Sequence, residues 1–327
     1  MRLLVGLTAI GAMVSFPPVV SAQPDRAPPR AFDGVPAFGH VFVIVGENAA
    51  RSELSTRLTP YLLGTVRPAS AWVTNYWSLP TTSSLPNYIG LTSGRFTTCD
   101  AHNLAPRFCH NKSNSIFHQL ASHGMSWHLW AESAARPCDF SDRGGDAGWN
   151  HYVVHHNPAL YYDSITGGVT SNTHVPDTAC TRNVVPAGTT GPSNTDAFDS
   201  ALAAGAVPQF NFVVPNECDN GHDRCGPTSR LKQFDNFLKA EVPKIMSSPA
   251  FGSDGVLVIT YDEGEAIGYP NRRNIALAVM GPLVKVGNYS GGVRWTHYSL
   301  LRTLEDGFGF GWLGAAADAR PLQSIWG

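Results

Sequence analysis

The chain has 327 residues, of which 15% are charged and 43% hydrophobic, and its formal net charge at pH 7 is −2. These values are ordinary for a globular protein. The near-neutral charge excludes the basic footprint by which proteins bind nucleic acid, and the polybasic patch by which they bind anionic membranes. We therefore expect neither a nucleic-acid partner nor binding to lipid through charge.

The first 38 residues are expected to precede the folded domain. Residues 1–22, MRLLVGLTAIGAMVSFPPVVSA, combine Arg2, an apolar centre and a small-residue exit at Ala22, which is typical of a secretory signal peptide. Residues 23–38 form a Pro-rich linker. No later stretch is long and apolar enough to span a bilayer. We expect a secreted protein, extracellular or periplasmic, without stable membrane insertion, whose domain covers residues 39–327.

Apolar runs bounded by polar residues predict six strands, at 40–46, 71–77, 126–131, 209–214, 255–261 and 275–280. Helices are expected at 115–123, 229–246 and 297–307, and a further helix starts near PNYIGL. Alternating strands and helices indicate an α/β fold with a mostly parallel central sheet flanked by helices. Residues 139–197 are rich in Gly, Thr, Asn, Asp and Pro, and we expect them to form a loop-rich cap beside the sheet.

The cysteines predict an oxidising compartment. An even number of them in an exported chain favours three disulfides. Nearness in sequence suggests one pairing among the fifteen that six cysteines allow. No C-x-x-C or paired Cys/His spacing favours a zinc cluster instead. The suggested pairs are Cys99–Cys109, Cys138–Cys180 and Cys218–Cys225.

Two of the predicted strands stop at acidic residues. HVFVIVGEN ends on Glu47 and Asn48, and GVLVITYDEGE ends on Asp262, Glu263 and Glu265. In open α/β sheets, ligands bind beyond the carboxyl ends of the strands. Carboxylates that crowd together repel unless a cation or a proton neutralises them, so the pattern favours a metal site. The alternative is that each group only caps the loop or helix that follows it.

A hydroxyl-rich turn precedes PNYIGL. Ser84 falls at the predicted N-cap of this helix, where the dipole and the backbone N–H groups favour an anion. Phosphoryl transfer to a side-chain oxygen needs such a hydroxyl beside a metal. The alternatives are that Ser84 only caps the helix, or that Ser83, Thr82 or Thr81 is the reactive hydroxyl.

A third polar segment, NECDNGHDRC, follows the strand predicted at 209–214. His222 stands next to Asp223 in this segment, which suits proton donation or contact with phosphate. The alternative is a turn rich in Asn and Asp with an exposed histidine. His155 and His156 in VVHHNP are equally ambiguous. His297, which opens the last helix, is favoured as a structural residue.

Six segments in the same order resemble the secreted bacterial phosphoesterase family: HVFVIVGEN, SLPNYIGLTSG, HHNPALYY, VVPNECDNGHD, VLVITYDEGE and HYSLLRTLEDGFG. That family holds acid phosphatases and phosphatidylcholine-type phospholipases C on an alkaline-phosphatase-like core. The likeness is strongest to the short mycobacterial-type secreted acid phosphatases. It extends from His40 to the terminal SIWG, and so covers nearly all of the domain.

The resemblance implies a role for each matched residue. One divalent metal ion is expected on Glu47, Asn48, Asp262, Glu263 and Ser84, with Ser84 also the nucleophile. All-oxygen ligands favour Mg, Ca or Mn over Zn.

The remaining matched residues are expected to handle phosphate and protons. Asn87 and His156 are expected to bind phosphate, with Asp223 as a further substrate contact. His222 is expected to protonate the leaving alcohol. The chain departs from the family at Gly46, where many relatives have a second acid.

These assignments predict hydrolysis of phosphomonoesters through a phosphoserine. The substrate is expected to be a small phosphorylated molecule or a phospholipid head group. The runner-up is a phospholipase C or another phosphodiesterase, against which the short chain argues. An acyl-transferring serine hydrolase is disfavoured because no G-x-S-x-G elbow is present. A binding protein on an inactive scaffold is disfavoured because every matched polar position is retained.

Overall fold

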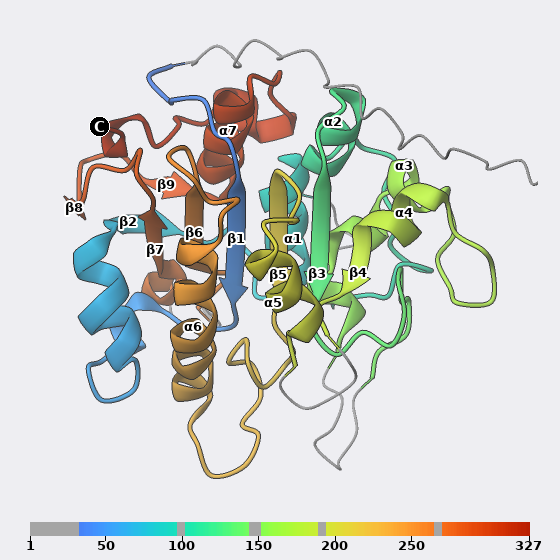
Figure 1. The fold of residues 1–327 in the computed structure, drawn as a ribbon, viewed down its shortest axis with the longest axis horizontal. Helices are drawn as coiled ribbons and strands as arrows, with labels where there is room; N and C mark the ends of the chain where they lie inside the picture. Colours follow the sequence, from blue (N-terminus) through green and yellow to red (C-terminus); the bar gives the residue numbers. More distant parts are fainter. Residues whose placement is uncertain (1–32, 97–101, 144–151, 189–193, 265–269) are drawn as a thin grey trace, which may run out of the picture.

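The computed structural model describes residues 33–96, 102–143, 152–188, 194–264 and 270–327. The expected signal peptide and most of the expected linker lie outside these ranges. Within them the chain forms a nine-stranded sheet in the order β4-β3-β5-β1-β6-β7-β2-β8, with β9 paired to β2 (Figure 1).

The strands are β1 (Val41–Gly46), β2 (Ala71–Trp77), β3 (Trp127–Ala131), β4 (Val184–Pro186), β5 (Phe210–Val214), β6 (Val256–Tyr261), β7 (Asn274–Met280), β8 (Gly287–Tyr289) and β9 (Trp295–Thr296). The α-helices are α1 (Ser84–Ser93), α2 (Ile116–Ser122), α3 (Asp163–Thr166), α4 (Thr178–Asn183), α5 (Asp196–Ala203), α6 (Arg230–Ser247) and α7 (His297–Phe308). Short 3₁₀ or π turns are η1 (Arg51–Glu53), η2 (Leu62–Val66), η3 (Arg67–Ala69), η5 (Val154–His156), η6 (Pro158–Tyr161), η7 (Pro270–Arg273), η8 (Gly314–Asp318) and η9 (Gln323–Ile325).

All six predicted strands and all four predicted helices are present. The strands β4, β3, β5, β1 and β6 run parallel, whereas β7 is antiparallel to both of its neighbours, β6 and β2. The sheet is therefore mixed but mostly parallel, as expected. Strands as short as β4, β8 and β9 carry too few residues to show a periodicity, and the sequence does not reveal them.

Helices cover both faces of the sheet. Phe42 on β1 and Trp130 on β3 pack against Phe198 of α5, and Figure 1 shows α6 beside α5 on that face. On the opposite face, Phe212 of β5 packs against Tyr88 of α1 and Phe117 of α2. Helix α7 joins this second layer, where it packs against α1. Strands buried on both faces explain the continuous apolar runs of β1, β5 and β6.

The parallel strands end along one edge of the sheet. Strand β1 leads into Glu47, β6 into Asp262, and β5 into the segment 215–229, which we call the His222 loop. Strand β2 runs in the same direction and is followed by α1, so the amino end of α1 lies at this edge as well. The topology therefore gathers segments that are far apart in sequence.

The region 139–197 holds more regular structure than its composition indicates. Strand β4 pairs with β3 and forms the end of the sheet, and α3, α4 and the start of α5 also belong to this region. Its role as a cap stays a prediction.

Two of the three expected disulfides are confirmed, Cys138–Cys180 and Cys218–Cys225. Cys109 is also disulfide-bonded, and its expected partner Cys99 lies outside the described residues. In the part of the chain that the structure describes, no helix is both long and apolar enough to cross a membrane.

Candidate active site

Glu47 lies at the carboxyl end of β1 and is fully buried. It accepts hydrogen bonds from the hydroxyls of Ser84, at 3.1 Å, and of Tyr88. Burial, and then the neighbouring charge of Asp262, raise the pKa of Glu47 well above its usual value. A carboxylate in this position needs a proton or a cation beside it.

Asn48 and Asp262 supply two more oxygens at the same place. The backbone N–H of Asn48 donates to Asp262 Oδ1 at 3.1 Å. Asn48 has φ = 53°, a left-handed conformation that asparagine adopts more readily than most residues. Asn48 Oδ1 and Asp262 Oδ2 are buried and have no hydrogen-bond partner among the described residues. Buried polar atoms of native proteins are nearly always paired, so these two oxygens call for a ligand. We call Glu47, Asn48, Asp262 and Glu263 the acidic edge.

His297 holds the end of β6 in place. Its Nε2 lies 2.6 Å from the carbonyl oxygen of Asp262, and its Nδ1 lies 2.8 Å from the hydroxyl of Tyr76. A carbonyl only accepts, so Nε2 carries the proton and Nδ1 accepts from Tyr76. Burial lowers the pKa of His297 to about 4, so the ring is neutral near pH 7. These contacts agree with the structural role favoured from the sequence.

Ser84 opens α1, but not at the expected position. Ser83 has extended backbone angles and is the N-cap, and Ser84 is the first helical residue, so the predicted N-cap is wrong by one residue. The proline at position 86 lacks an N–H group, which costs nothing in the first turn of a helix. The hydroxyl of Ser84 therefore points at Glu47 and does not cap the helix.

Asn87 and Glu263 connect α1 to β6. The side-chain amide of Asn87 donates to Ser83 O at 3.1 Å and to Glu263 Oε2 at 3.5 Å, and Asn87 Oδ1 accepts from the N–H of Leu79 at 2.9 Å. Both side chains are buried. Asn87 is thus fixed one helical turn from Ser84, with its amide directed toward the acidic edge.

Packing explains the glycine that precedes Glu47. A Cβ atom added to Gly46 would lie 2.5 Å from the ring of Phe234, which α6 places against β1. Phe234 also packs edge-on against Tyr261. An acidic side chain at position 46 therefore does not fit without displacing a core ring.

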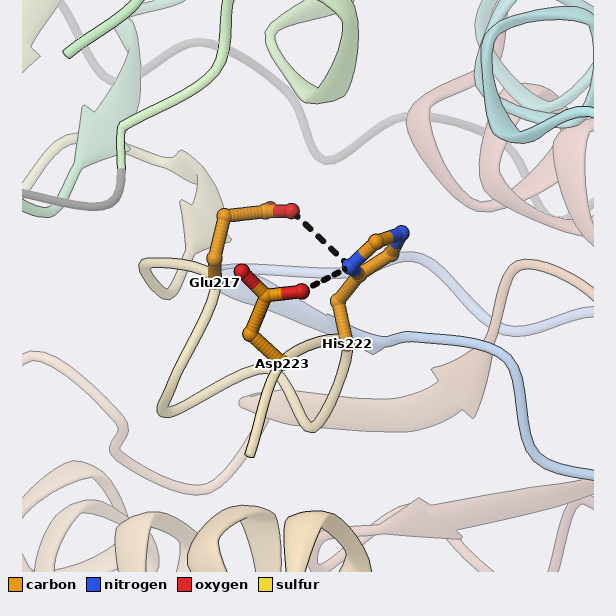
Figure 2. Close-up of side chains that lie close together, drawn as sticks. All are labelled: Glu217, His222 and Asp223. Carbon is orange, nitrogen blue, oxygen red and sulfur yellow. Dashed lines mark hydrogen bonds and ion pairs between the residues drawn. The ribbon is translucent and has the colours of Figure 1, made fainter. Parts of the chain in front are cut away.

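The His222 loop carries a second group of polar side chains at the same edge. His222 Nδ1 lies 2.8 Å from Asp223 Oδ1 and 3.1 Å from Glu217 Oε2 (Figure 2). The ring nitrogen Nε2 of His222 points away from both carboxylates. The side chains of His222 and Asp223 are 36% and 48% exposed, whereas that of Glu217 is 7% exposed.

Glu217 is a site residue that the sequence did not reveal. Its Oε1 lies 2.7 Å from His156 Nδ1, so one carboxylate joins two imidazoles. His156 Nε2 lies 3.4 Å from Glu47 Oε2, within ion-pair range but with poor hydrogen-bond geometry. His156 is brought from η5, far away in sequence, so no local pattern could have indicated its contact with Glu217.

The histidines shift the charge state of their neighbours. Burial alone would raise the pKa of Glu217, but His156 and His222 lower it to about 2. Burial opposes the charged form of His222, yet Glu217 and Asp223 raise its pKa above the usual value. Burial and the charge of His156 lower the pKa of His155 to about 3, so His155 is a neutral neighbour.

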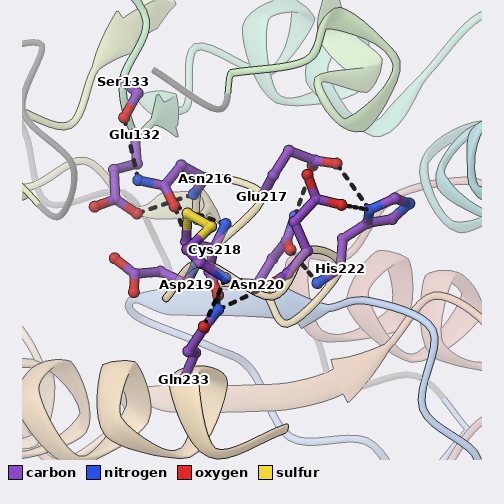
Figure 3. The surroundings of a disulfide bond; sticks show 11 residues. Glu132, Ser133, Asn216, Glu217, Cys218, Asp219, Asn220, His222 and Gln233 are labelled. Atoms are coloured by element: carbon purple, nitrogen blue, oxygen red, sulfur yellow. Dashed lines mark hydrogen bonds and ion pairs between the residues drawn. A yellow bond between two sulfur atoms is a disulfide. The ribbon is translucent and has the colours of Figure 1, made fainter. Parts of the chain in front are cut away.

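The His222 loop is tied to the scaffold behind it (Figure 3). The disulfide Cys218–Cys225 closes it, and Gln233 of α6 donates to Cys218 O at 2.7 Å. Buried Glu132, which follows β3, accepts from the N–H of Asn216 at 2.9 Å. These contacts fix Glu217 and His222 relative to the ends of β3 and β5.

All nine residues predicted for the site therefore meet at one edge of the sheet. Two places in it suit a cation. The acidic edge offers oxygen atoms only, two of them buried and unsatisfied. Glu217, His222 and Asp223 offer three atoms within 4.8 Å of one another, but these already contact each other and are partly exposed. The nine predicted residues that meet at this edge are Glu47, Asn48, Ser84, Asn87, His156, His222, Asp223, Asp262 and Glu263.

Solved structures confirm the predicted class of fold. A protein in the alkaline phosphatase superfamily from Vibrio parahaemolyticus superposes with a TM-score of 0.59 at 14% identity, over 93% of this chain and 74% of that one. A putative sulfatase from Bacteroides thetaiotaomicron gives 0.57 at 11% identity, over 88% and 74%. The chain has an alkaline-phosphatase-like α/β core.

The chain belongs to the Phosphoesterase family, whose model matches residues 60–311. This match confirms the family that the sequence resembles. A probable acid phosphatase of Kluyveromyces lactis is 24% identical over 262 residues, 77% of this chain and 55% of that protein. A phosphatidylinositol-3-phosphatase of Mycobacterium tuberculosis is 23% identical over 327 residues, 99% of this chain and 93% of that protein. The chain thus spans about half of the yeast relative and nearly all of the mycobacterial one. Glu47 and Asn48 lie before the stretch that the family model matches.

Proposed function

We propose that this chain is a secreted, metal-dependent phosphatase that hydrolyses phosphomonoesters through a phosphoserine on Ser84. The observation that carries the proposal is the position of the Ser84 hydroxyl. It lies at the amino end of a helix and 3.1 Å from Glu47, beside two buried oxygens that have no partner among the described residues. Nucleophile, anion-favouring helix end and oxygen ligands are the parts that phosphoryl transfer to a serine requires.

The acidic edge fits one hard divalent cation. Asn48 Oδ1 and Asp262 Oδ2 are unsatisfied, and Glu47 is forced toward protonation by burial and by Asp262. Glu47, Asn48, Asp262, Glu263 and the Ser84 hydroxyl would hold the ion. A carboxylate and amide oxygen set favours Mg, Ca or Mn over Zn. Once bound, the ion would stabilise the Ser84 alkoxide and balance charge on the phosphoryl oxygens.

The residues of the chain then perform two in-line displacements. Ser84 releases its hydroxyl proton to solvent, and the resulting alkoxide Oγ forms a bond to phosphorus while the bond from phosphorus to the leaving oxygen breaks. Protonated His222 donates its proton to that leaving oxygen. Asn87 donates to a phosphoryl oxygen from its fixed position on α1. Water next attacks the phosphoserine and gives a proton to neutral His222. The bond from phosphorus to Ser84 Oγ breaks, which releases inorganic phosphate and restores the Ser84 alkoxide and protonated His222.

A phosphoinositide head group is a second candidate substrate beside a small soluble phosphomonoester. The observation that favours it is the match along 99% of this chain to a phosphatidylinositol-3-phosphatase. Both substrates are phosphomonoesters, so the same site and the same reaction serve either. Secretion is supported by the disulfides Cys138–Cys180 and Cys218–Cys225, which persist in oxidising compartments.

Two synthetic esters test the proposal. The protein is incubated with p-nitrophenyl phosphate and with bis(p-nitrophenyl) phosphate, before and after removal of divalent metal by EDTA. We expect turnover of the monoester to exceed that of the diester, to vanish with EDTA and to return with Mg, Ca or Mn. Preference for the diester would instead indicate a phosphodiesterase, and full activity without metal would contradict the metal role.

A further inference from the structure

The carboxylate of Glu217 has a position that the reaction described above does not use. It is buried and lies between the imidazoles of His156 and His222, with their Nδ1 atoms at 2.7 and 3.1 Å. Asn220 donates to the same carboxylate at 3.0 Å. The carboxylate accepts hydrogen bonds from His156 and Asn220 and forms an ion pair with His222, whose Nδ1 also contacts Asp223 at 2.8 Å. These contacts restrict the orientation of both imidazoles.

We infer that Glu217 is the positioning residue of this site: it holds the proton of His222 on Nδ1 and directs Nε2 toward the leaving group. The inference rests on the proposed phosphatase function. A carboxylate only accepts, so each imidazole must present an N–H to Glu217. In Figure 2 the Nε2 atom of His222 is the ring nitrogen turned away from both carboxylates, and it is therefore the atom that meets the substrate.

Glu217 is also the more effective of the two carboxylates that face His222. Asp223 is 48% exposed, so water screens its charge, whereas Glu217 is nearly enclosed. Three other titratable groups among the described residues lie near His222. They are His156, with a ring centre 5.9 Å away, its neighbour His155, and Asp262 at the end of β6. Burial opposes a charge on His222, so the carboxylates must sustain it, and Glu217 is more deeply buried than Asp223.

The same carboxylate couples the His222 loop to the acidic edge. Glu217 binds His156 Nδ1, and His156 Nε2 faces Glu47 at 3.4 Å. The backbone N–H of Glu47 in turn donates to Asn220 O in the His222 loop, at 2.8 Å. The proton donor and the nucleophile are thereby held in one frame, although β1, β5 and η5 supply its parts.

Glu217→Gln tests this role with little change in shape. An amide presents one acceptor and one donor, so it satisfies only one of the two imidazoles and its N–H₂ opposes the Nδ1 proton of the other. We expect kcat on an alkyl phosphate to fall about 10- to 100-fold. The alkaline limb of the pH profile should move to lower pH by about 1 unit, because His222 loses its strongest counter-charge. The matched control Asp223→Asn should move the limb less.

The outcomes separate this inference from the proposed function. A wild-type protein without activity on either synthetic ester would defeat the proposed function itself. The role of Glu217 alone would be overturned if the wild type is active and the Glu217→Gln variant keeps kcat within about twofold, with the alkaline limb of its pH profile unmoved. If the variant does not fold, ¹⁵N NMR of wild-type His222, assigned by comparison with His222→Asn, decides. We expect an imidazolium that titrates above the usual value near 6.5, and a titration at or below that value would overturn the inference.

Discussion

The acidic edge and the His222 loop lie at the same edge of the sheet, but they differ in how their negative charge is balanced. At the acidic edge, buried oxygens from β1 and β6 crowd together, and two of them have no partner among the described residues. In the His222 loop, carboxylates of Glu217 and Asp223 surround an imidazole, and each contact is already made. The excess negative charge of the acidic edge needs a cation, whereas that of the His222 loop is balanced by the proton of the imidazolium. We therefore propose that the metal binds at the acidic edge and that His222 carries the mobile proton.

The largest expected effect comes from removing the nucleophile. Ser84→Ala should lower kcat by at least about 10⁴-fold, because alanine has no oxygen that can form the bond to phosphorus. Its free energy of unfolding should change by less than about 1 kcal/mol, since Ser83 and not Ser84 is the N-cap. Steady-state kinetics and chemical denaturation give the two values. The neighbouring variant Ser83→Ala is the control, and it should keep most of its activity; the reverse pattern would make Ser83 the nucleophile.

The proton donor is tested by the choice of leaving group. p-Nitrophenolate leaves without help, whereas an alkoxide needs a proton. His222→Asn should therefore lower kcat on an alkyl phosphate about 100-fold or more, and on p-nitrophenyl phosphate less than about 10-fold. Because the pKa of His222 is raised, wild-type activity on the alkyl ester should be full at acidic pH and fall as the pH rises through that pKa. Equal losses on both esters would make His222 a phosphate-binding residue instead.

The two disulfides should separate stability from activity. In the chain-entropy model, Cys138–Cys180, with a sequence separation of 42, contributes about 4 kcal/mol, and Cys218–Cys225, with a separation of 7, about 2.5 kcal/mol. Double serine variants should follow that order in denaturant melts. Activity should follow the opposite order, with roughly a 10-fold loss when the His222 loop is opened, because Cys218–Cys225 closes the loop of the proposed proton donor and Cys138–Cys180 does not. Loss of activity in proportion to stability would remove the loop from the mechanism.

Glu305, a buried carboxyl of α7, provides a separate test of the rule that crowded acids need a cation or a proton. Glu305 accepts from the N–H of Leu313 at 2.9 Å, and its Oε2 has no hydrogen-bond partner among the described residues. Burial, with the charge of Asp306, raises its pKa to about 8. The native state therefore binds the extra proton between the unfolded value, about 4.5, and about pH 8.

Stability attached to Glu305 is consequently full below about pH 4.5 and is lost as the pH rises toward 8. Glu305→Gln, which mimics the protonated acid, should exceed the wild type in stability by less than about 1 kcal/mol at pH 5 and by about 4 kcal/mol at pH 8. Activity should not change. Denaturant melts at the two pH values check the result, and an equal difference at both would mean that Glu305 is ionised in the native state.

The sequence predicts the strands of this protein and the residues at their ends better than it predicts contacts between distant side chains. The runs of β1 and β6 are continuous and apolar, and they end on acids, so both the strands and the position of Glu47 and Asp262 follow from local pattern. The role of Glu217 does not follow, because its partner His156 arrives from a distant turn. The start of α1 is misplaced by one residue since Ser83 and Ser84 are equally good caps by type, and only backbone angles distinguish them.

Metal content is the most direct test of the assignment that separates the two regions. Wild-type protein, Asp262→Asn and His222→Asn are purified in parallel and exchanged into metal-free buffer. Bound metal per chain is then counted by mass spectrometry after Mg, Ca or Mn is added. We predict one ion in the wild type and in His222→Asn, and none in Asp262→Asn. If Asp262→Asn kept its ion and His222→Asn lost it, the ion would lie among Glu217, His222 and Asp223, which would contradict a metal site at the acidic edge.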